Sequence, residues 1–286
     1  MWYCPTLSPT INMKNKLFLI LVVLFTQPVF SQDILDGDKV WYSTYLNYKL
    51  NKKIYFDDYL LLSFNGLQHS FSFFQNDFNI NYALSKKATL YAGYSYAMYN
   101  WIPEYKTAYS QNISAVSTIG FNKAEVGGKY DISIGKNFKI DQDLAAQFYF
   151  PQLEKYQFRF EYSIKLSYKE RKTSFRFTPF VQGVIFYYQN GIPVHYYKDD
   201  GSLGDYKSPN GFHRYRAKFG LSFRPIKSFK SMGIVLYYNI QKEFNISGFG
   251  NDLNIKTPLG NITNTQNIIY PFNNYNVFGI QLNFFL

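Results

Sequence analysis

The chain has 286 residues, which is enough for one large domain or two small ones, and its formal net charge is +11. Aromatic residues make up 21 % of it, whereas only 17 % of residues are charged and the mean hydropathy is −0.25. A soluble core that buried so many rings would show continuous apolar runs, which are almost absent beyond residue 30. The lone cysteine, Cys4, excludes a disulfide framework.

The N-terminal region has the order of a secretory signal peptide. Two lysines precede the apolar stretch Leu17–Phe25, and small or permissive residues follow up to Ser31. The apolar stretch is about half of the roughly 20 residues that a membrane-spanning helix needs. We therefore expect residues 1–31 to be cleaved off, with Met13 as an alternative translation start, and residues 32–286 to form the mature chain.

Beyond residue 39 the dominant pattern is the alternation of apolar and polar residues that is typical of β-strands. The longest case is Tyr156–Tyr168, where one face carries only aromatic and aliphatic residues and the other only polar or charged ones. Strands of soluble proteins usually have about 5–6 residues, whereas a tilted membrane strand needs about 9–11. The length of this run therefore favours a membrane strand.

We predict about twelve strands, separated mostly by short polar turns. Their ranges are 39–50, 54–66, 71–84, 88–100, 108–119, 124–134, 138–150, 155–168, 173–188, 212–224, 229–243 and 273–286. Ten strands are the alternative if 108–134 holds only one. An even count would place both ends of the mature chain at the periplasmic side and the two long breaks, Asn190–Gly211 and Asn245–Phe272, at the outer side.

The last strand carries a family resemblance. In Tyr275–Leu286, Gly279 is followed by alternating apolar residues and an apolar end, which resembles the terminal strand of Gram-negative outer-membrane β-barrels. The mature chain is also loosely similar to outer-membrane barrels known only as a domain of unknown function, with Trp41 opening the first strand. The resemblance implies an outer-membrane location and recognition of residues 275–286 by the barrel-assembly machinery, but no activity.

The expected fold is therefore all-β: a transmembrane, antiparallel, up-and-down β-barrel. Hydrocarbon cannot satisfy unpaired backbone groups, so the sheet has to close, with one face toward lipid and the other toward a lumen. The alternation assigns these charged residues to the lumen: Asp57, Asp77, Glu125, Lys129, Asp131, Lys139, Asp141, Asp143, Arg159, Glu161, Lys165, Arg176, Arg214, Arg216 and Lys218. They predict either an ion-pair network that fills the barrel or a porin-like passive pore for small charged solutes.

An outer-membrane enzyme is the rival class. Barrel lipases and lipid A deacylases place a His and a Ser two residues apart on one strand. His69, His195 and His213 are each followed two residues later by an aromatic residue, so we predict no catalytic residue. Residues 198–205 lack the residue order of a calcium loop, and we predict no metal site and no cofactor. We expect His213 in a lipid-facing row near the rim.

A third hypothesis is a surface receptor or adhesin that acts through the two long breaks. The expected partners are outer-membrane lipids and lipopolysaccharide. The export signal and the alternation argue against nucleic acid, although residues 214–227 form a basic run with interleaved aromatic residues.

Overall fold

The computed structural model describes the ten ranges 37–65, 70–101, 117–150, 156–170, 176–191, 194–197, 203–207, 210–225, 231–243 and 275–286. The chain divides into two compact units, Met1–Ile34 and Leu35–Leu286, and all described residues belong to the second. The predicted signal peptide and the alternative start lie outside the described residues. Within the described ranges, no helix has the length and apolar character that crossing a membrane requires.

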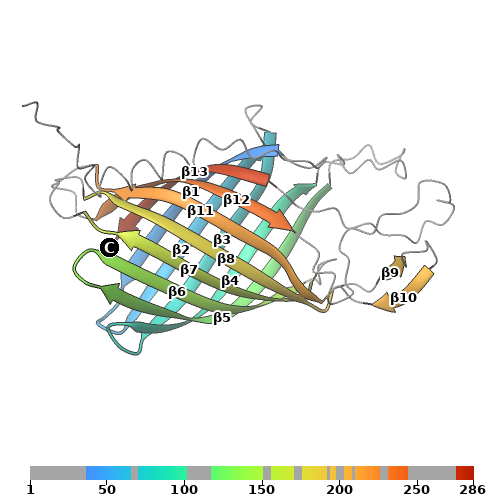
Figure 1. The fold of residues 1–286 in the computed structure, drawn as a ribbon, viewed down its shortest axis with the longest axis horizontal. Coiled ribbons are helices and arrows are strands. Elements are labelled where there is room, and N and C mark those ends of the chain that lie inside the picture. Colours follow the sequence, from blue (N-terminus) through green and yellow to red (C-terminus); the bar gives the residue numbers. More distant parts are fainter. Residues whose placement is uncertain are drawn as a thin grey trace, which may run out of the picture. The chain divides into compact units, whose positions relative to one another are not determined.

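Eleven strands form one closed barrel, in the order β1-β13-β12-β11-β8-β7-β6-β5-β4-β3-β2 (Figure 1). They are β1 (Gly37–Lys49), β2 (Ile54–Asn65), β3 (Ser70–Ala83), β4 (Ala88–Trp101), β5 (Ser117–Ile134), β6 (Phe138–Phe150), β7 (Phe158–Tyr168), β8 (Thr178–Gln189), β11 (Gly211–Phe223), β12 (Met232–Glu243) and β13 (Tyr275–Phe285). Two further strands, β9 (Val194–Tyr197) and β10 (Leu203–Lys207), pair only with each other. The prediction of an all-β closed barrel is confirmed.

The barrel closes through a parallel pair of strands, β1 and β13, which lie side by side in Figure 1. Their register runs from Gly37↔Tyr275 to Asn47↔Phe285, and every other neighbouring pair is antiparallel. Eleven strands can close only in this way, because an odd number of alternating strands leaves the first and last pointing in the same direction.

The predicted strand count and its parity are therefore wrong. One long strand, β5, contains the predicted strand 124–134 and begins with residues 117–119, the end of the strand predicted over 108–119. The rest of that predicted strand lies outside the described residues. The assumption of an even count placed both ends of the mature chain on one side. Instead, β1 begins at one rim of the barrel and β13 ends at the other. The short hairpin β9–β10 lies inside a break that was predicted without strands.

The two rims differ in the length of their connections. Strands β4, β8 and β12 end at the same rim, where the connections 102–116, 190–210 and 244–274 follow them; we call it the long-connection rim. The opposite, short-turn rim carries tight turns and the chain end, where the Leu286 amide donates to the Asn47 carbonyl over 2.8 Å. The two long breaks therefore leave the barrel at one rim, as the sequence predicted.

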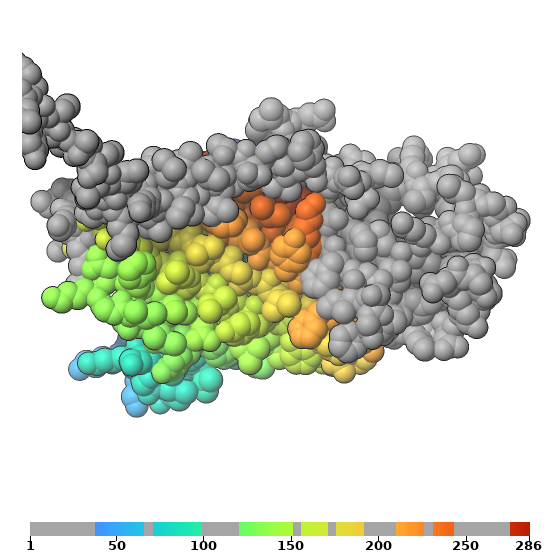
Figure 2. Space-filling model, in the orientation of Figure 1, coloured from blue at the N-terminus to red at the C-terminus, as the bar shows by residue number. Residues whose placement is uncertain are grey.

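Side chains alternate between the interior of the barrel and its outer surface, as the period of two requires. On β6, for example, Leu144 is 58 % exposed on the outer surface, whereas its neighbour Ala145 is 5 % exposed and faces inward. In Figure 2 the side chains of β5 to β8 and β11 form a continuous outer cover. This surface is rich in exposed Tyr, Phe, Leu, Ile and Val.

Two glycines let inward-facing rings lie flat against the barrel wall. Gly279 on β13 is the cross-strand neighbour of Tyr237, and a Cβ atom there would lie 2.0 Å from Tyr237 Cζ. Gly127 stands in the same relation to Tyr91, with a distance of 2.4 Å. Any side chain at these positions would displace the ring. The absence of a side chain on glycine therefore leaves the space that each tyrosine ring occupies, as in other sheets where a ring covers a glycine.

The parallel closure predicts which engineered cysteines form a disulfide. Ser43 and Gln281 are register partners that both face inward, and paired strands lie about 4.8 Å apart, within disulfide range. In a Cys4→Ser background, Ser43→Cys with Gln281→Cys should cross-link and change migration on a non-reducing gel. Ser43→Cys with Val235→Cys is the control, since Val235 lies one strand further, at about 10 Å. Equal cross-linking of both pairs, or of neither, contradicts the closure.

Candidate functional site in the barrel interior

Two opposed walls of charge line the interior. The acidic wall consists of carboxylates on β2, β3, β5 and β6, and the basic wall of Lys and Arg on β7 and β11. The acidic members are Asp57, Asp77, Glu125, Asp131, Asp141 and Asp143; the basic members are Arg159, Lys165, Arg214, Arg216 and Lys218. Strand β8 lies between β7 and β11, so the basic wall occupies one continuous sector of the barrel.

The remaining predicted lumen charges fall into two groups. Lys129, Lys139 and Glu161 face inward with the walls and pair with members of the opposite charge. Arg176 lies before the start of β8, at the short-turn rim, with a left-handed backbone φ of 49°. Arg176 therefore belongs to the mouth of the barrel. The predicted strand 173–188 had placed it within a strand, and this placement is wrong.

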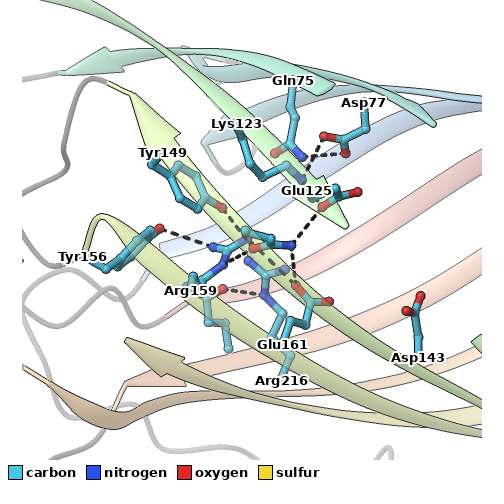
Figure 3. Close-up of polar contacts among 12 residues, drawn as sticks. Gln75, Asp77, Lys123, Glu125, Asp143, Tyr149, Tyr156, Arg159, Glu161 and Arg216 are labelled. Atoms are coloured by element: carbon cyan, nitrogen blue, oxygen red, sulfur yellow. Dashed lines mark hydrogen bonds and ion pairs between the residues drawn. The ribbon is translucent and has the colours of Figure 1, made fainter. Parts of the chain in front are cut away.

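Gln147 of β6 joins the two walls, and Figure 3 labels its three partners, Glu125, Arg159 and Glu161. Its amide nitrogen donates to Glu125 over 3.1 Å and to Glu161 over 3.4 Å, while its amide oxygen accepts from Arg159 over 2.6 Å. Lys123 bonds the same acidic side, at 2.9 Å from Glu125 and 3.3 Å from Asp77. The network links β3, β5, β6 and β7, so it ties strands across the barrel as well as along its wall.

Arg159 is held by rings as well as by polar groups. Its guanidinium carbon lies 5.1 Å from the centre of the Tyr149 ring, 5.5 Å from that of Tyr156 and 5.0 Å from that of Phe186. It also lies 3.9 Å from the Glu161 carboxylate. A planar guanidinium can satisfy both kinds of partner at once, because its faces stack while its edge donates.

A layer of aromatic side chains covers this network on the side of the long-connection rim. Phe186 and Tyr188 are fully buried, and the ring of Tyr156 lies 4.4 Å from that of Tyr188 and 5.0 Å from that of Tyr149. A second buried cluster, around Trp41, contains Phe73 and Tyr275. Together with the network, these two clusters fill the interior toward that rim.

His213 belongs to the interior and not to the outer surface. A β-bulge in the pairing of β11 with β8 shifts the register between Phe212 and Arg214. Because the bulge inserts one residue, His213 and Arg214 are both buried, and the imidazole packs 5.7 Å from the Tyr188 ring. The predicted lipid-facing position of His213 is therefore wrong, since strict alternation does not anticipate a bulge.

The interior becomes more accessible toward the short-turn rim. Along the inward face of β5, the side chain of Lys123 is 7 % exposed, that of Lys129 is 35 % and that of Asp131 is 38 %. Lys139 bridges Asp131, at 2.8 Å, and Asp141. Along this strand, charged side chains are therefore buried near the long-connection rim and partly exposed near the short-turn rim.

Asp57 also lies toward the short-turn rim and is buried within a polar cage. It accepts hydrogen bonds from Tyr45 and Asn47, each at 2.6 Å, and from Asn81 at 3.0 Å, with Lys129 at 3.6 Å. A buried carboxylate satisfied this fully is a structural group that ties β1, β2, β3 and β5 together.

The interior shows no candidate metal site within the described residues. No group of three or more His, Cys, Asp or Glu side chains there has the geometry to hold a metal ion. His69 lies outside the described residues, and only the backbone of His195 is described.

No protein-family model matches the chain, and no curated protein matches it. The arrangement can neutralise, hold or exclude charged groups.

Sequence reasoning missed the centre of the network. Lys123 and Gln147 were not among the predicted lumen residues, although both share a strand face with one. Lys123 lies two residues from Glu125 on β5, and Gln147 lies four residues from Asp143 on β6. Residues 120–123 had been assigned to no strand, which hid Lys123. Gln147 carries no charge and so passed unnoticed, even though alternation from Asp143 points it inward.

Removal of the central cation should strongly destabilise the barrel. Arg159→Ala leaves Glu161 and Glu125 with less compensation inside the barrel, and breaking a buried pair in this way costs about 3–5 kcal/mol. The free energy of unfolding in urea of the refolded protein measures the loss. Lys136→Ala, in the exposed turn between β5 and β6, is the control and should change it by less than about 0.5 kcal/mol. Equal effects of the two variants contradict the network.

Proposed function

We propose that the protein is an integral β-barrel of a Gram-negative outer membrane that acts as a structural component closed to free diffusion. The observation that carries the proposal is the contrast between the two faces of the sheet. Large apolar side chains cover the outer surface, whereas charged residues and hydrogen-bonded amides line the interior. A water-soluble protein has the opposite arrangement, because exposed apolar patches of this extent mark contact with a membrane or a partner.

Aromatic bands on the outer surface support membrane insertion. Toward the long-connection rim, rings of neighbouring strands touch, as between Phe148 and Phe158 at 5.1 Å and between Tyr187 and Phe212 at 5.2 Å. Toward the short-turn rim, Phe138 contacts Tyr168 at 5.1 Å. Barrels of outer membranes carry such aromatic girdles at both lipid–water interfaces.

The spacing of the two bands fits the thickness of a membrane. Phe138 and Phe148 are ten residues apart on β6, or about 33 Å at about 3.3 Å per residue. With a strand tilt of about 40°, this is about 25 Å along the barrel axis, the usual height of the apolar band. Between the bands the outer surface presents aliphatic residues such as Leu144 and Ile164.

Three pairs of polar side chains on the outer surface hydrogen-bond to each other. Asn76 donates to Asp58 over 2.8 Å, Tyr162 donates to Gln142 over 2.8 Å, and Tyr94 donates to Asn122. Pairing of this kind lowers the cost of placing polar side chains against hydrocarbon. These pairs are therefore compatible with an apolar environment.

The filled half of the interior favours a closed barrel over a passive pore. The aromatic layer and the ion-pair network together occupy the interior below the long-connection rim, with Phe186 and Tyr188 fully buried. A water-filled channel would leave side chains at that level accessible to solvent.

Fractionation and conductance test the two parts of this proposal. After expression in a Gram-negative host, the protein should sediment with the outer membrane, and the purified barrel should give no unitary currents in planar bilayers. A double variant, Arg159→Ser with Tyr188→Ala, removes parts of the network and of the aromatic layer and should conduct. Recovery in the soluble fraction contradicts the location, and steady currents through the unmodified barrel contradict closure and favour the pore.

A further inference from the structure

One row of the basic wall carries two lysines without a carboxylate partner. On neighbouring strands, Lys165 of β7 is the register partner of Gln182 of β8, which in turn is the partner of Lys218 of β11. All three side chains face inward at the same level of the barrel. Because each strand spacing is about 4.8 Å, the two lysine backbones lie about 10 Å apart, and a concave wall brings their side chains toward a common space.

Aromatic rings hold both ammonium groups in place. Lys165 Nζ lies 4.3 Å from the centre of the Phe180 ring, and Lys218 Nζ lies 4.5 Å from that of Tyr237. A cation over a ring face is oriented by it, but its N–H donors still need acceptors. Within the described part of the chain, neither lysine forms a salt bridge, whereas Lys123, Lys129 and Lys139 all do.

The nearest acidic neighbour is already engaged. Asp141 of β6 is the register partner of Lys165, yet its carboxylate bonds Lys139, which also binds Asp131. On the other side of the row, Asn239 of β12 is the register partner of Lys218. Its amide group is fully buried, and neither its nitrogen nor its oxygen has a hydrogen-bond partner in the protein. The row therefore has unused donors at two adjacent positions.

The row lies nearer to the short-turn rim than Arg159 and Arg214 do. Lys165, Gln182 and Lys218 are half-buried, whereas Ser167 and Phe180, which lie still nearer to that rim, are 4 % and 6 % exposed. A cavity of about 510 Å³ lies at the mouth, and Lys169, Arg176, Arg224 and Glu170 contribute its charged lining. Lys169 directly follows the end of β7 and is four residues from Lys165, or about 13 Å of extended chain. An anion that enters at the mouth would therefore meet this basic lining before it reaches the row.

We propose that Lys165, Gln182 and Lys218 form a binding site for a small phosphate-bearing anion that enters through the short-turn mouth. A phosphate dianion would neutralise both ammonium groups and accept hydrogen bonds from them and from the Gln182 amide, as lysines do in other phosphate sites. The attraction is strengthened because the row lies inside the barrel, where water screens charge less than at the surface. The site depends on the barrel interior alone and not on the proposed membrane location.

Binding of inorganic phosphate to the refolded full-length barrel in a zwitterionic detergent tests the site. Calorimetric titration should show saturable binding, and Lys165→Gln with Lys218→Gln should weaken it at least tenfold. Lys165→Arg with Lys218→Arg keeps both charges and should bind within threefold of the unmodified barrel. Lys86→Gln, in the exposed turn between β3 and β4, is the matched control and should change nothing. Absence of saturable binding, or equal binding by the double Gln variant, overturns the proposal.

Thermal unfolding separates a ligand site from a purely structural role. If the lysines bind an anion, phosphate should raise the melting temperature of the unmodified barrel and leave that of the double Gln variant unchanged. The double Gln variant should be at least as stable as the unmodified barrel in phosphate-free buffer, because it loses two uncompensated charges. A variant that unfolds at lower temperature in phosphate-free buffer, with no phosphate effect on either protein, identifies the lysines as structural and overturns the site.

Two further ligands distinguish the source of the phosphate group. Glycerol 3-phosphate represents a free solute, and a short-chain phosphatidic acid represents a lipid headgroup. Competition with inorganic phosphate by glycerol 3-phosphate supports a solute site, and competition by the lipid alone supports a headgroup site. If neither competes although phosphate binds, the site does not accept phosphate monoesters, and the proposal in this form is overturned.

Discussion

Closure of the backbone hydrogen-bond ladder is the constraint on which the rest of the structure depends. With eleven strands, only a parallel pairing of β1 with β13 leaves the sheet without a free edge. Once the sheet is closed, successive side chains along each strand point alternately into the confined interior and toward the outer surface. Both the charged network and the apolar outer surface follow from that single division.

The interior is organised by where charge falls along the chain. Acidic inward residues come mainly from β2 to β6 and basic ones from β7 and β11, so closing the sheet sets the two walls against each other. They meet around Gln147 and Arg159, where hydrogen bonds and rings compensate the burial of charge. Nearer the short-turn rim, the basic wall has more charged groups than the carboxylates beside it can pair. Among the described residues, Lys165 and Lys218 therefore have no salt bridge, and we propose that they bind an anion.

Much of this was predictable because alternation is a local property of the sequence. The strand ranges, the inward direction of most charged residues and the common rim of the two long breaks all follow from it. Three features do not, because they depend on pairing between distant strands. These are the parallel β1–β13 closure, the bulge that turns His213 inward, and the continuity of β5 through residues 120–123. Gln147 was missed because charge, and not hydrogen-bonding capacity, guided the choice of lumen residues.

Spin labels on β6 in lipid vesicles test most directly that the outer surface meets hydrocarbon and that the inward face does not. Single cysteines from residue 142 to residue 147, in a Cys4→Ser background, would each carry a nitroxide. Accessibility to oxygen should peak at outward positions such as Leu144 and fall at inward positions such as Ala145, with a period of two. Labels at outward positions that are accessible to a water-soluble nickel chelate and shielded from oxygen would contradict the account.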